Sequence, residues 1–358
     1  MQNNFVTVNN GRFYLTGAPY RFIGANMYEL ANVEPKITEA MLKDAAEQGF
    51  RVIRFWAFEP VKKEKLTEIC DISRELDLKL IPVLSDPTGY LQSYKIENDW
   101  YREGYKKNYL QLAADIVNGL KDRTEILLWE LINEPVTDSF EDIYNFAKDA
   151  SEKFKTADPN HLISIGTIGG VGDKFGNFFS RFKLSNFEKL YSIKTLDCIS
   201  IHDYSFNSTM FERLDIMYRL KGKHELSGLS SSLDTMINFI PSAIDGFTIG
   251  RFNSLIDFPS TLRSIWRNYN RKNIRIAKKL NKPLYVGEVG FKKNNEVLRK
   301  KILERELNNY FKEGIAGVLL WSFESQGKSL DGHDYGFNKE NGFGEVVKKI
   351  SSIIDIKI

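Results

Sequence analysis

Short apolar runs alternate with longer, helix-periodic stretches along most of the chain. The apolar runs predict eight strands, at residues 21–26, 52–58, 78–84, 126–131, 162–165, 196–202, 283–288 and 316–321. The periodic stretches predict helices at residues 37–48, 64–77, 99–120, 140–155, 262–280, 296–310 and 343–353. Because parallel strands need helical crossovers and a closed barrel has no free edge, this alternation predicts one (β/α)₈ TIM barrel domain over residues 1–358.

Two features lie outside the simple repeat. Residues 5–8 and 12–15 alternate around Asn9–Asn10–Gly11, which predicts an N-terminal β-hairpin covering one end of the sheet. Residues 203–260, after the sixth strand, form a connection too long for an ordinary barrel loop and too apolar for simple disorder. We interpret this insertion as a lid at a substrate cleft or a surface for homo-oligomer formation, against the alternative of a packed decoration of the barrel rim.

The main alternative fold is a doubly wound open sheet. It is disfavoured because no Gly-x-Gly-x-x-Gly or Walker-type phosphate loop follows the first strand. No internal repeat or change of composition suggests a second folded domain.

Charge and composition exclude several classes of partner. The net charge is +3 and no block of like charge resembles a nucleic-acid arm, so binding to nucleic acid is not expected. No window approaches the roughly 18 apolar residues that span a bilayer, so no membrane partner is expected. Cys70 and Cys198 fit buried free thiols. As written, the sequence predicts a cytoplasmic protein, or a secreted one if a signal peptide has been removed.

Polar residues lie at the carboxyl ends of these apolar strands. In a barrel, the carboxyl ends of all the strands meet at one mouth, where the chemistry of such proteins is placed. The residues brought there are Asn26 and Tyr28, Arg54 and Trp56, Asn133 and Glu134, His202 and Tyr204, Glu288, and Trp321. Contributions from six strands are hard to explain by packing alone, since each residue taken singly could be an ordinary core or loop residue.

Two carboxylates at one mouth suit glycoside hydrolysis, in which one is a proton donor and the other an ionised nucleophile. Arg54 near Glu288 would favour the charged form of Glu288, and Tyr204 could donate a hydrogen bond to it. Glu134, beside that charge and partly buried, would hold the proton.

The remaining mouth residues suit a sugar. Asn133 would be free to bind a sugar 2-hydroxyl, and Trp56 and Trp321 offer flat faces that could stack on pyranose rings. Asp86, Tyr90 and Glu324 are weaker candidates for contacts to neighbouring sugars.

The strand-end motifs resemble glycoside hydrolase family 5, in the clan of retaining (β/α)₈ glycosidases. Residues 128–135, LWELINEP, resemble the acid/base strand of the family, residues 285–290, YVGEVG, its nucleophile strand, and residues 200–204, SIHDY, its His-x-Tyr segment. The resemblance implies that Glu134 is the acid/base and Glu288 the nucleophile. It extends from about residue 13 to 335.

Within the family, residues 10–28 and 52–58 most resemble the β-mannanase branch. This implies an endo-β-1,4-mannanase acting on a β-linked oligo- or polysaccharide. An exo-acting β-mannosidase and a β-1,4-glucanase remain as alternatives. Ser85–Asp86 replaces the family's usual polar pair, and the mannanases' Asn-Asn-Trp pattern is absent.

No cofactor or metal is expected, because the four histidines show no ligand spacing and residues 331–334 are too short for a calcium loop. A non-catalytic carbohydrate-binding barrel would keep Trp56 and Trp321 but has no reason to keep both glutamates. A serine or cysteine hydrolase is disfavoured because there is no Gly-x-Ser-x-Gly elbow and neither cysteine ends a strand.

Overall fold

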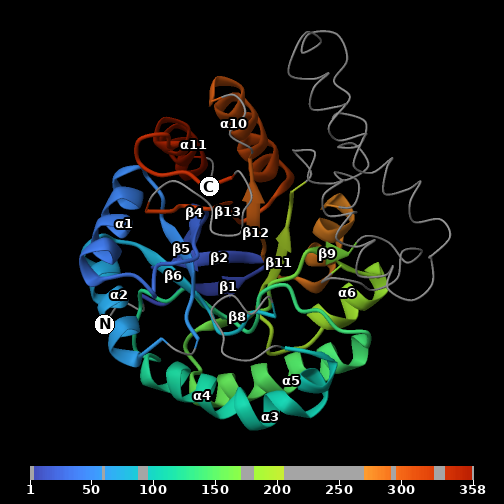
Figure 1. Cartoon of the computed structure of the whole chain (residues 1–358). Coiled ribbons are helices and arrows are strands. Elements are labelled where there is room, and N and C mark those ends of the chain that lie inside the picture. The colour runs from blue at the N-terminus through green and yellow to red at the C-terminus, as the bar shows by residue number, and fades with distance from the viewer. Residues whose placement is uncertain are drawn as a thin grey trace, which may run out of the picture.

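Eight parallel strands form the centre of the computed structural model, which describes residues 4–58, 61–87, 96–170, 181–204, 270–291, 296–325 and 335–356 (Figure 1). The strands are β4 (Phe22–Met27), β5 (Val52–Trp56), β6 (Lys79–Val83), β7 (Leu128–Glu130), β8 (Leu162–Ser164), β11 (Ile199–His202), β12 (Leu284–Gly290) and β13 (Gly317–Trp321). They pair in the order β11-β12-β13-β4-β5-β6-β7-β8. Each predicted strand overlaps one of these, and the TIM-barrel prediction is confirmed.

The sheet closes between β8 and β11 through single contacts rather than a ladder. The Asp197 amide donates to the Ile163 carbonyl at 2.8 Å, and Ser164 Oγ donates to the Cys198 carbonyl at 3.1 Å. The two end strands of the sheet are therefore held side by side, and the strand ends form a common mouth.

Helices surround the strands in Figure 1: α1 (Pro35–Glu47), α2 (Lys63–Glu75), α3 (Tyr105–Asn108), α4 (Leu110–Gly119), α5 (Phe140–Ala157), α6 (Leu184–Tyr191), α10 (Glu296–Glu313) and α11 (Gly344–Ile356), with a further helical stretch at residues 270–280. Helix α1 begins with a proline, whose fixed φ suits the first turn. It ends at Glu47, and Gly49, two residues later, has a φ of +89°, the left-handed conformation that commonly follows a helix end. Helix α5 is capped by Ser139, which accepts a hydrogen bond from the Asp142 amide at 3.3 Å.

The N-terminal hairpin carries a third strand that the sequence did not predict. Strands β1 (Thr7–Asn9), β2 (Arg12–Leu15) and β3 (Ala18–Tyr20) form an antiparallel sheet. Asn10–Gly11 and Thr16–Gly17 make its two turns with positive φ at both residues, as tight hairpins need. Phe13 packs with Phe22 and Tyr285 in one apolar cluster at the amino ends of the barrel strands, so this sheet covers the end opposite the mouth.

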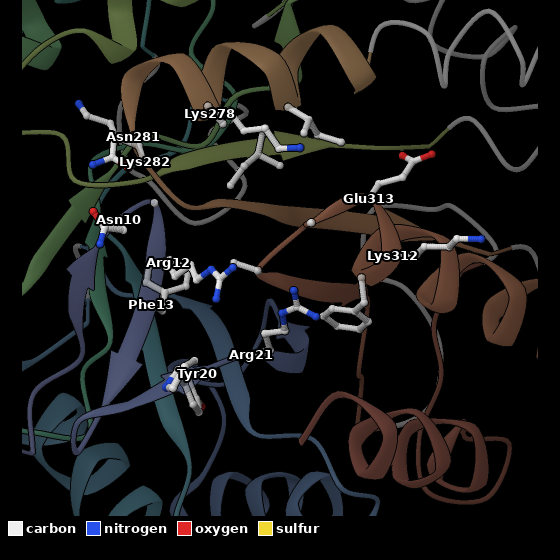
Figure 2. A pocket seen from close by; sticks show the side chains of 18 residues that line it. Asn10, Arg12, Phe13, Tyr20, Arg21, Lys278, Asn281, Lys282, Lys312 and Glu313 are labelled. Atoms are coloured by element: carbon white, nitrogen blue, oxygen red, sulfur yellow. The ribbon is translucent and has the colours of Figure 1, made fainter. Parts of the chain in front are cut away.

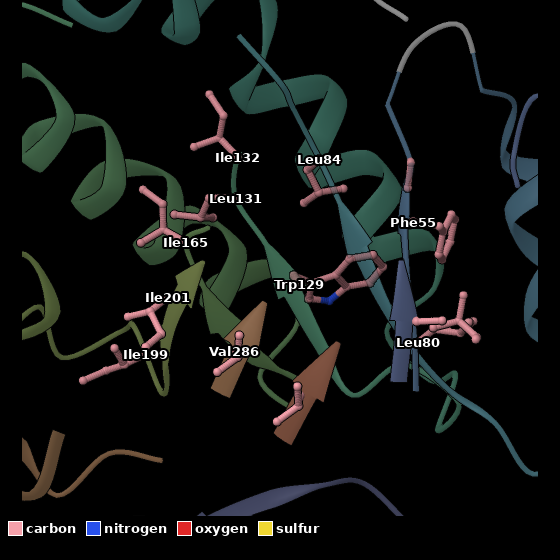
Figure 3. Packing of buried hydrophobic residues seen from close by; sticks show 14 of the residues in the cluster. Phe55, Leu80, Leu84, Trp129, Leu131, Ile132, Ile165, Ile199, Ile201 and Val286 are labelled. Carbon is pink, nitrogen blue, oxygen red and sulfur yellow. The ribbon is translucent and has the colours of Figure 1, made fainter. Parts of the chain in front are cut away.

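Alternating strand residues face two different layers. Side chains such as Phe55, Trp129, Ile199 and Val286 point out of the barrel and join the large apolar core shared with the helices (Figure 3). Their neighbours in sequence, Arg54 and Glu130 among them, point into the barrel. The fully buried apolar layer therefore fixes which strand residues can reach the interior.

Some helix predictions need correction. The single helix predicted at residues 99–120 is divided into a π-helical turn (Trp100–Gly104), α3 and α4, and the break falls at Tyr109, whose hydroxyl donates to the Leu131 carbonyl at 2.7 Å. Helix α6 was not predicted. Tyr90 and nearly all of the 203–260 insertion lie outside the described residues. Within the described part of the chain, no helix has the length and apolar character needed to cross a membrane.

Candidate active site

Arg54 is the centre of the polar cluster at the mouth. Its side chain is fully buried and donates hydrogen bonds to Glu130 Oε1 at 2.5 Å, Glu288 Oε1 at 2.9 Å, Asn133 Oδ1 at 2.7 Å and Asn26 Oδ1 at 2.8 Å. Burial alone would lower the pKa of the guanidinium, but the charges of Glu130 and Glu288 outweigh it and raise that pKa above its ordinary value. Arg54 is thus a fixed positive charge between two buried carboxylates.

Glu288, on β12, is held at both carboxylate oxygens. Arg54 donates to Oε1, and the Tyr204 hydroxyl donates to Oε2 at 2.6 Å. Hydrogen bonds from a charged guanidinium and from a hydroxyl fix the direction of this carboxyl group. The site therefore holds the Glu288 side chain in one orientation.

Glu134 follows β7 and faces Glu288 across the mouth. Its Oε1 lies 2.7 Å from His202 Nδ1, and Nδ1 lies 3.6 Å from Glu288 Oε2. The backbone φ of Glu134 is +34°, a left-handed conformation that costs a residue with a side chain about 1–3 kcal/mol and that clusters at active sites. Among the described residues His202 Nε2 is buried without a hydrogen-bond partner, which favours the tautomer with its proton on Nδ1, directed at Glu134.

Asn133 and Trp56 have fewer groups available to a sugar than the sequence suggested. Asn133 Oδ1 accepts from Arg54, and its Nδ2 donates to Asp86 Oδ2 at 3.0 Å, which leaves one amide hydrogen for a sugar. Trp56 is 1% exposed, with the Arg54 guanidinium 4.7 Å above its ring and its Nε1 donating to Asp86 at 2.6 Å. Trp56 therefore does not offer the open stacking face that we expected, and Asp86 orients both side chains.

Three aromatic side chains pack together beside this cluster. Trp321 packs edge-on against Trp56 with ring centroids 5.5 Å apart, and Tyr28 contacts both rings. Trp321 is 7% exposed, so it too is largely covered. Glu324, one of the weaker candidates, is buried and accepts a hydrogen bond from Ser322.

Glu130 and Tyr285 belong to the site but were missed by the sequence analysis. Tyr285 donates to Glu130 Oε2 at 2.9 Å, and burial, followed by the charge of Glu130, raises the pKa of this tyrosine. The sequence did contain one signal: Glu130 is a lone carboxylate within an apolar run. A fully buried charge needs a partner, so this residue could have been predicted to pair with a cation. Arg54, the matching lone cation of β5, is that partner.

Glu134, His202 and Glu288 also form a compact group of possible metal ligands, with one ligand atom from each lying within 4.8 Å of the others. The hydrogen bonds of Arg54 and Tyr204 already occupy both oxygens of Glu288. A cation here would have to share these oxygens with the two donors and approach the charge of Arg54. The arrangement suits two facing carboxyl groups, one held by Arg54 and Tyr204 and the other by His202, better than it suits a metal.

The family assignment rests on most of the chain. The family model described as Cellulase (glycosyl hydrolase family 5) matches residues 14–327. The chain belongs to glycosyl hydrolase family 5. The predicted resemblance to this family is confirmed.

The sequences of curated relatives align with only part of this family 5 chain. A probable mannan endo-1,4-beta-mannosidase F from Neosartorya fischeri is 24% identical over 245 residues, which are 56% of this chain and 54% of that protein. Mannan endo-1,4-beta-mannosidase 5 from Solanum lycopersicum is 27% identical over 252 residues, which are 56% of this chain and 61% of that protein. The chain thus spans little more than half the length of these relatives.

Solved structures agree with the barrel over nearly the whole chain. An endo-1,4-beta-mannanase from Rhizomucor miehei matches with a TM-score of 0.68 and 16% identity, covering 98% of this chain and 99% of that one. An endoglucanase from Pseudomonas stutzeri matches with a TM-score of 0.56 and 15% identity, covering 92% and 93%. At these identities the structures show the fold alone.

Proposed function

We propose that this protein is a retaining glycoside hydrolase that cleaves β-1,4-mannosidic bonds within mannan, glucomannan or manno-oligosaccharides. The observation that carries the proposal is the pair Glu134 and Glu288, whose nearest oxygens lie within 4.8 Å of each other in one buried polar cluster. Retaining enzymes keep their two carboxyl groups about 5–5.5 Å apart, whereas inverting ones need about 6.5–9.5 Å for a water molecule. The close pair favours direct attack by one carboxylate.

In the first step Glu288 attacks the anomeric carbon, the glycosidic C–O bond breaks, and Glu134 gives its proton to the leaving oxygen. A sugar is then bound covalently to Glu288. In the second step Glu134 takes a proton from water, the water oxygen attacks the same carbon, and the Glu288 carboxylate leaves. Two inversions restore the original β configuration.

The neighbours of each glutamate suit these roles. Arg54 and Tyr204 stabilise the charge that Glu288 carries before attack and regains when it leaves. His202, hydrogen-bonded to Glu134 in the folded protein, can hold that carboxyl in line with the leaving oxygen. Asn133 keeps one N–H that can reach a hydroxyl of the bound sugar.

The mannan preference comes from the names of the relatives and from the resemblance of the first two strands. The runner-up is a β-1,4-glucanase, because the family model carries the name Cellulase and an endoglucanase shares the fold. A non-catalytic sugar-binding barrel is disfavoured, since binding alone would not require a strained Glu134 facing a second carboxylate.

A substrate panel tests the proposal. Purified protein is incubated with linear mannan, glucomannan, carboxymethyl cellulose and mannobiose, and the products are sized over time. An endo-mannanase shortens mannan rapidly and releases oligosaccharides of several lengths, with little action on cellulose. Release of mannose alone from chain ends would replace the endo assignment by an exo one, and preferential cleavage of cellulose would replace mannan by glucan.

A further inference from the structure

A second cavity lies at the opposite end of the barrel from the paired glutamates. It has a volume of about 450 Å³ and lies between the N-terminal sheet, the helical residues 270–280 and the end of α10 (Figure 2). Its walls include the Asn10–Gly11 turn, Leu284 at the start of β12 and Ala316 just before β13. None of the residues assigned to the proposed hydrolysis contributes to it.

The cavity is strongly basic. Five of its lining residues are cationic and one is acidic: Arg12, Arg21, Lys278, Lys282 and Lys312 against Glu313. Glu313 pairs with Arg271 at 3.5 Å, and Lys282 Nζ donates to the carbonyls of Tyr191 and Ile193. The charges of the two arginines are therefore not balanced by the acidic residue of the wall.

Arg12 and Arg21 form the distinctive part of the site. Figure 2 shows both guanidinium groups directed into the space between the N-terminal strands and the helix that carries Lys278. Neither has an ion pair or a side-chain hydrogen bond with any described residue. Burial, followed by the positive charge of Arg12, lowers the pKa of Arg21.

We propose that this cavity binds a small phosphate ester, with Arg12 and Arg21 gripping the phosphate group. Guanidinium forks match phosphate oxygens with paired hydrogen bonds. A phosphate ester carries a charge of about −1.5 to −2 near pH 7, so one group can offset two arginines, whereas a single carboxylate would leave one unbalanced.

The size of the cavity favours an ester over the free ion. Small-molecule pockets have volumes of about 300–1,000 Å³, and this one lies within that range. Ile274, Ala277, Leu284 and Phe311 are also among its lining residues, and each of them is buried. A compact organic body attached to the phosphate can fill this volume, which a free phosphate ion would leave largely open.

The arginine pair is poorly explained as a stabilising device. Two like charges near each other do not stabilise the folded protein without an anion, and a neutral side chain at either position would break no ion pair or side-chain hydrogen bond with a described residue. Binding of a dianion removes the repulsion, so the ligand stabilises the fold that binds it. The inference is independent of the proposed hydrolase activity, since it uses different residues at the other end of the barrel.

Calorimetric titration tests the site, with glucose 6-phosphate, inorganic phosphate and unphosphorylated glucose as probes. We expect saturable binding of glucose 6-phosphate, weaker binding of inorganic phosphate and none of glucose. The double variant Arg12→Gln/Arg21→Gln loses charge-assisted hydrogen bonds and should bind the ester about 10–100-fold more weakly. The matched control Lys36→Gln/Lys43→Gln removes two exposed positive charges from α1 and should bind like the parent protein.

Thermal unfolding supplies a second readout. Without phosphate, Arg12→Gln should unfold at the same temperature as the parent or higher, because the repulsion is gone; a clear fall would assign the pair a structural role and overturn the proposal. Absence of saturable ester binding, or equal binding by both double variants, would also overturn it. Inorganic phosphate binding as tightly as the ester would overturn the ester assignment.

Discussion

The hydroxyl of Tyr204 provides a test of how Glu288 works. It donates to Glu288 Oε2 at 2.6 Å, and its ring packs against Tyr335 with centroids 5.6 Å apart. Tyr204→Phe keeps the ring and removes the hydroxyl that makes this hydrogen bond. Hydrogen bonds to charged groups contribute about 1.5–3 kcal/mol, and 1.36 kcal/mol corresponds to about a factor of ten in rate, so up to about 10–150-fold is at stake.

The loss should fall on one step of the reaction. When the covalent intermediate breaks down, negative charge returns to Glu288, and Tyr204 stabilises that developing charge. Without the hydroxyl the second step slows and the intermediate accumulates, since only interactions strengthened in the transition state affect the rate. We therefore expect kcat and KM to fall together, and an aryl β-mannobioside to release a rapid burst of phenolate followed by a slow steady rate.

Tyr285→Phe is the matched control. It removes a hydroxyl that donates to Glu130 at 2.9 Å. Glu130 shares Arg54 with Glu288 but has no proposed contact with the substrate. This variant should be less stable to urea by about 1.5–3 kcal/mol but should show no burst. The reasoning is refuted if Tyr204→Phe changes kcat by less than about threefold, which is under 1 kcal/mol, or if both variants slow equally without a burst.

Three further predictions follow from the same cluster and from the barrel wall. Azide should restore turnover of an aryl glycoside to Glu134→Ala and give a β-glycosyl azide, whereas an α-glycosyl azide from that variant would reverse the two roles. Glu130→Gln should cost about 3 kcal/mol in urea unfolding, because buried Arg54 loses one counter-charge, and a loss near zero would mean that Glu288 alone balances it. Burial raises the pKa of Asp158, but its hydrogen bond and charge interaction with His161 outweigh this and lower it overall. The carboxylate therefore stabilises the fold above the unfolded pKa of about 3.9, and the stability gap between the parent protein and Asp158→Asn should close as the pH falls below about 4; a gap independent of pH would contradict this.

The order of the barrel strands could be predicted because each strand is buried on both faces and reads as an apolar run. Elements with weaker patterns were harder to see. Strand β3 contains Pro19, which reads as a break, yet the strand lies at the edge of its sheet, where proline is tolerated. Helix α6 has only eight residues and no side-chain cap, so its short pattern resembled a loop.

The site likewise contains residues that the sequence could place and contacts that it could not. Residues that end strands could be placed at the mouth, because topology alone brings strand ends together. The pairing of Arg54 with Glu130, 76 positions apart, depends on which side chains share one interior layer. Sequence spacing does not encode that layer, so Trp56 was expected to be open although Arg54 covers its ring.

Trapping of the covalent intermediate tests the central proposal most directly. The protein is incubated with a 2-deoxy-2-fluoro β-mannoside carrying an activated leaving group, which slows breakdown of the intermediate, and is then digested for mass spectrometry. We predict one added sugar per chain, on the peptide that contains Glu288 and on that side chain. A label on Glu134, or steady hydrolysis of unmodified substrate with no labelled enzyme at any time, would contradict nucleophilic attack by Glu288.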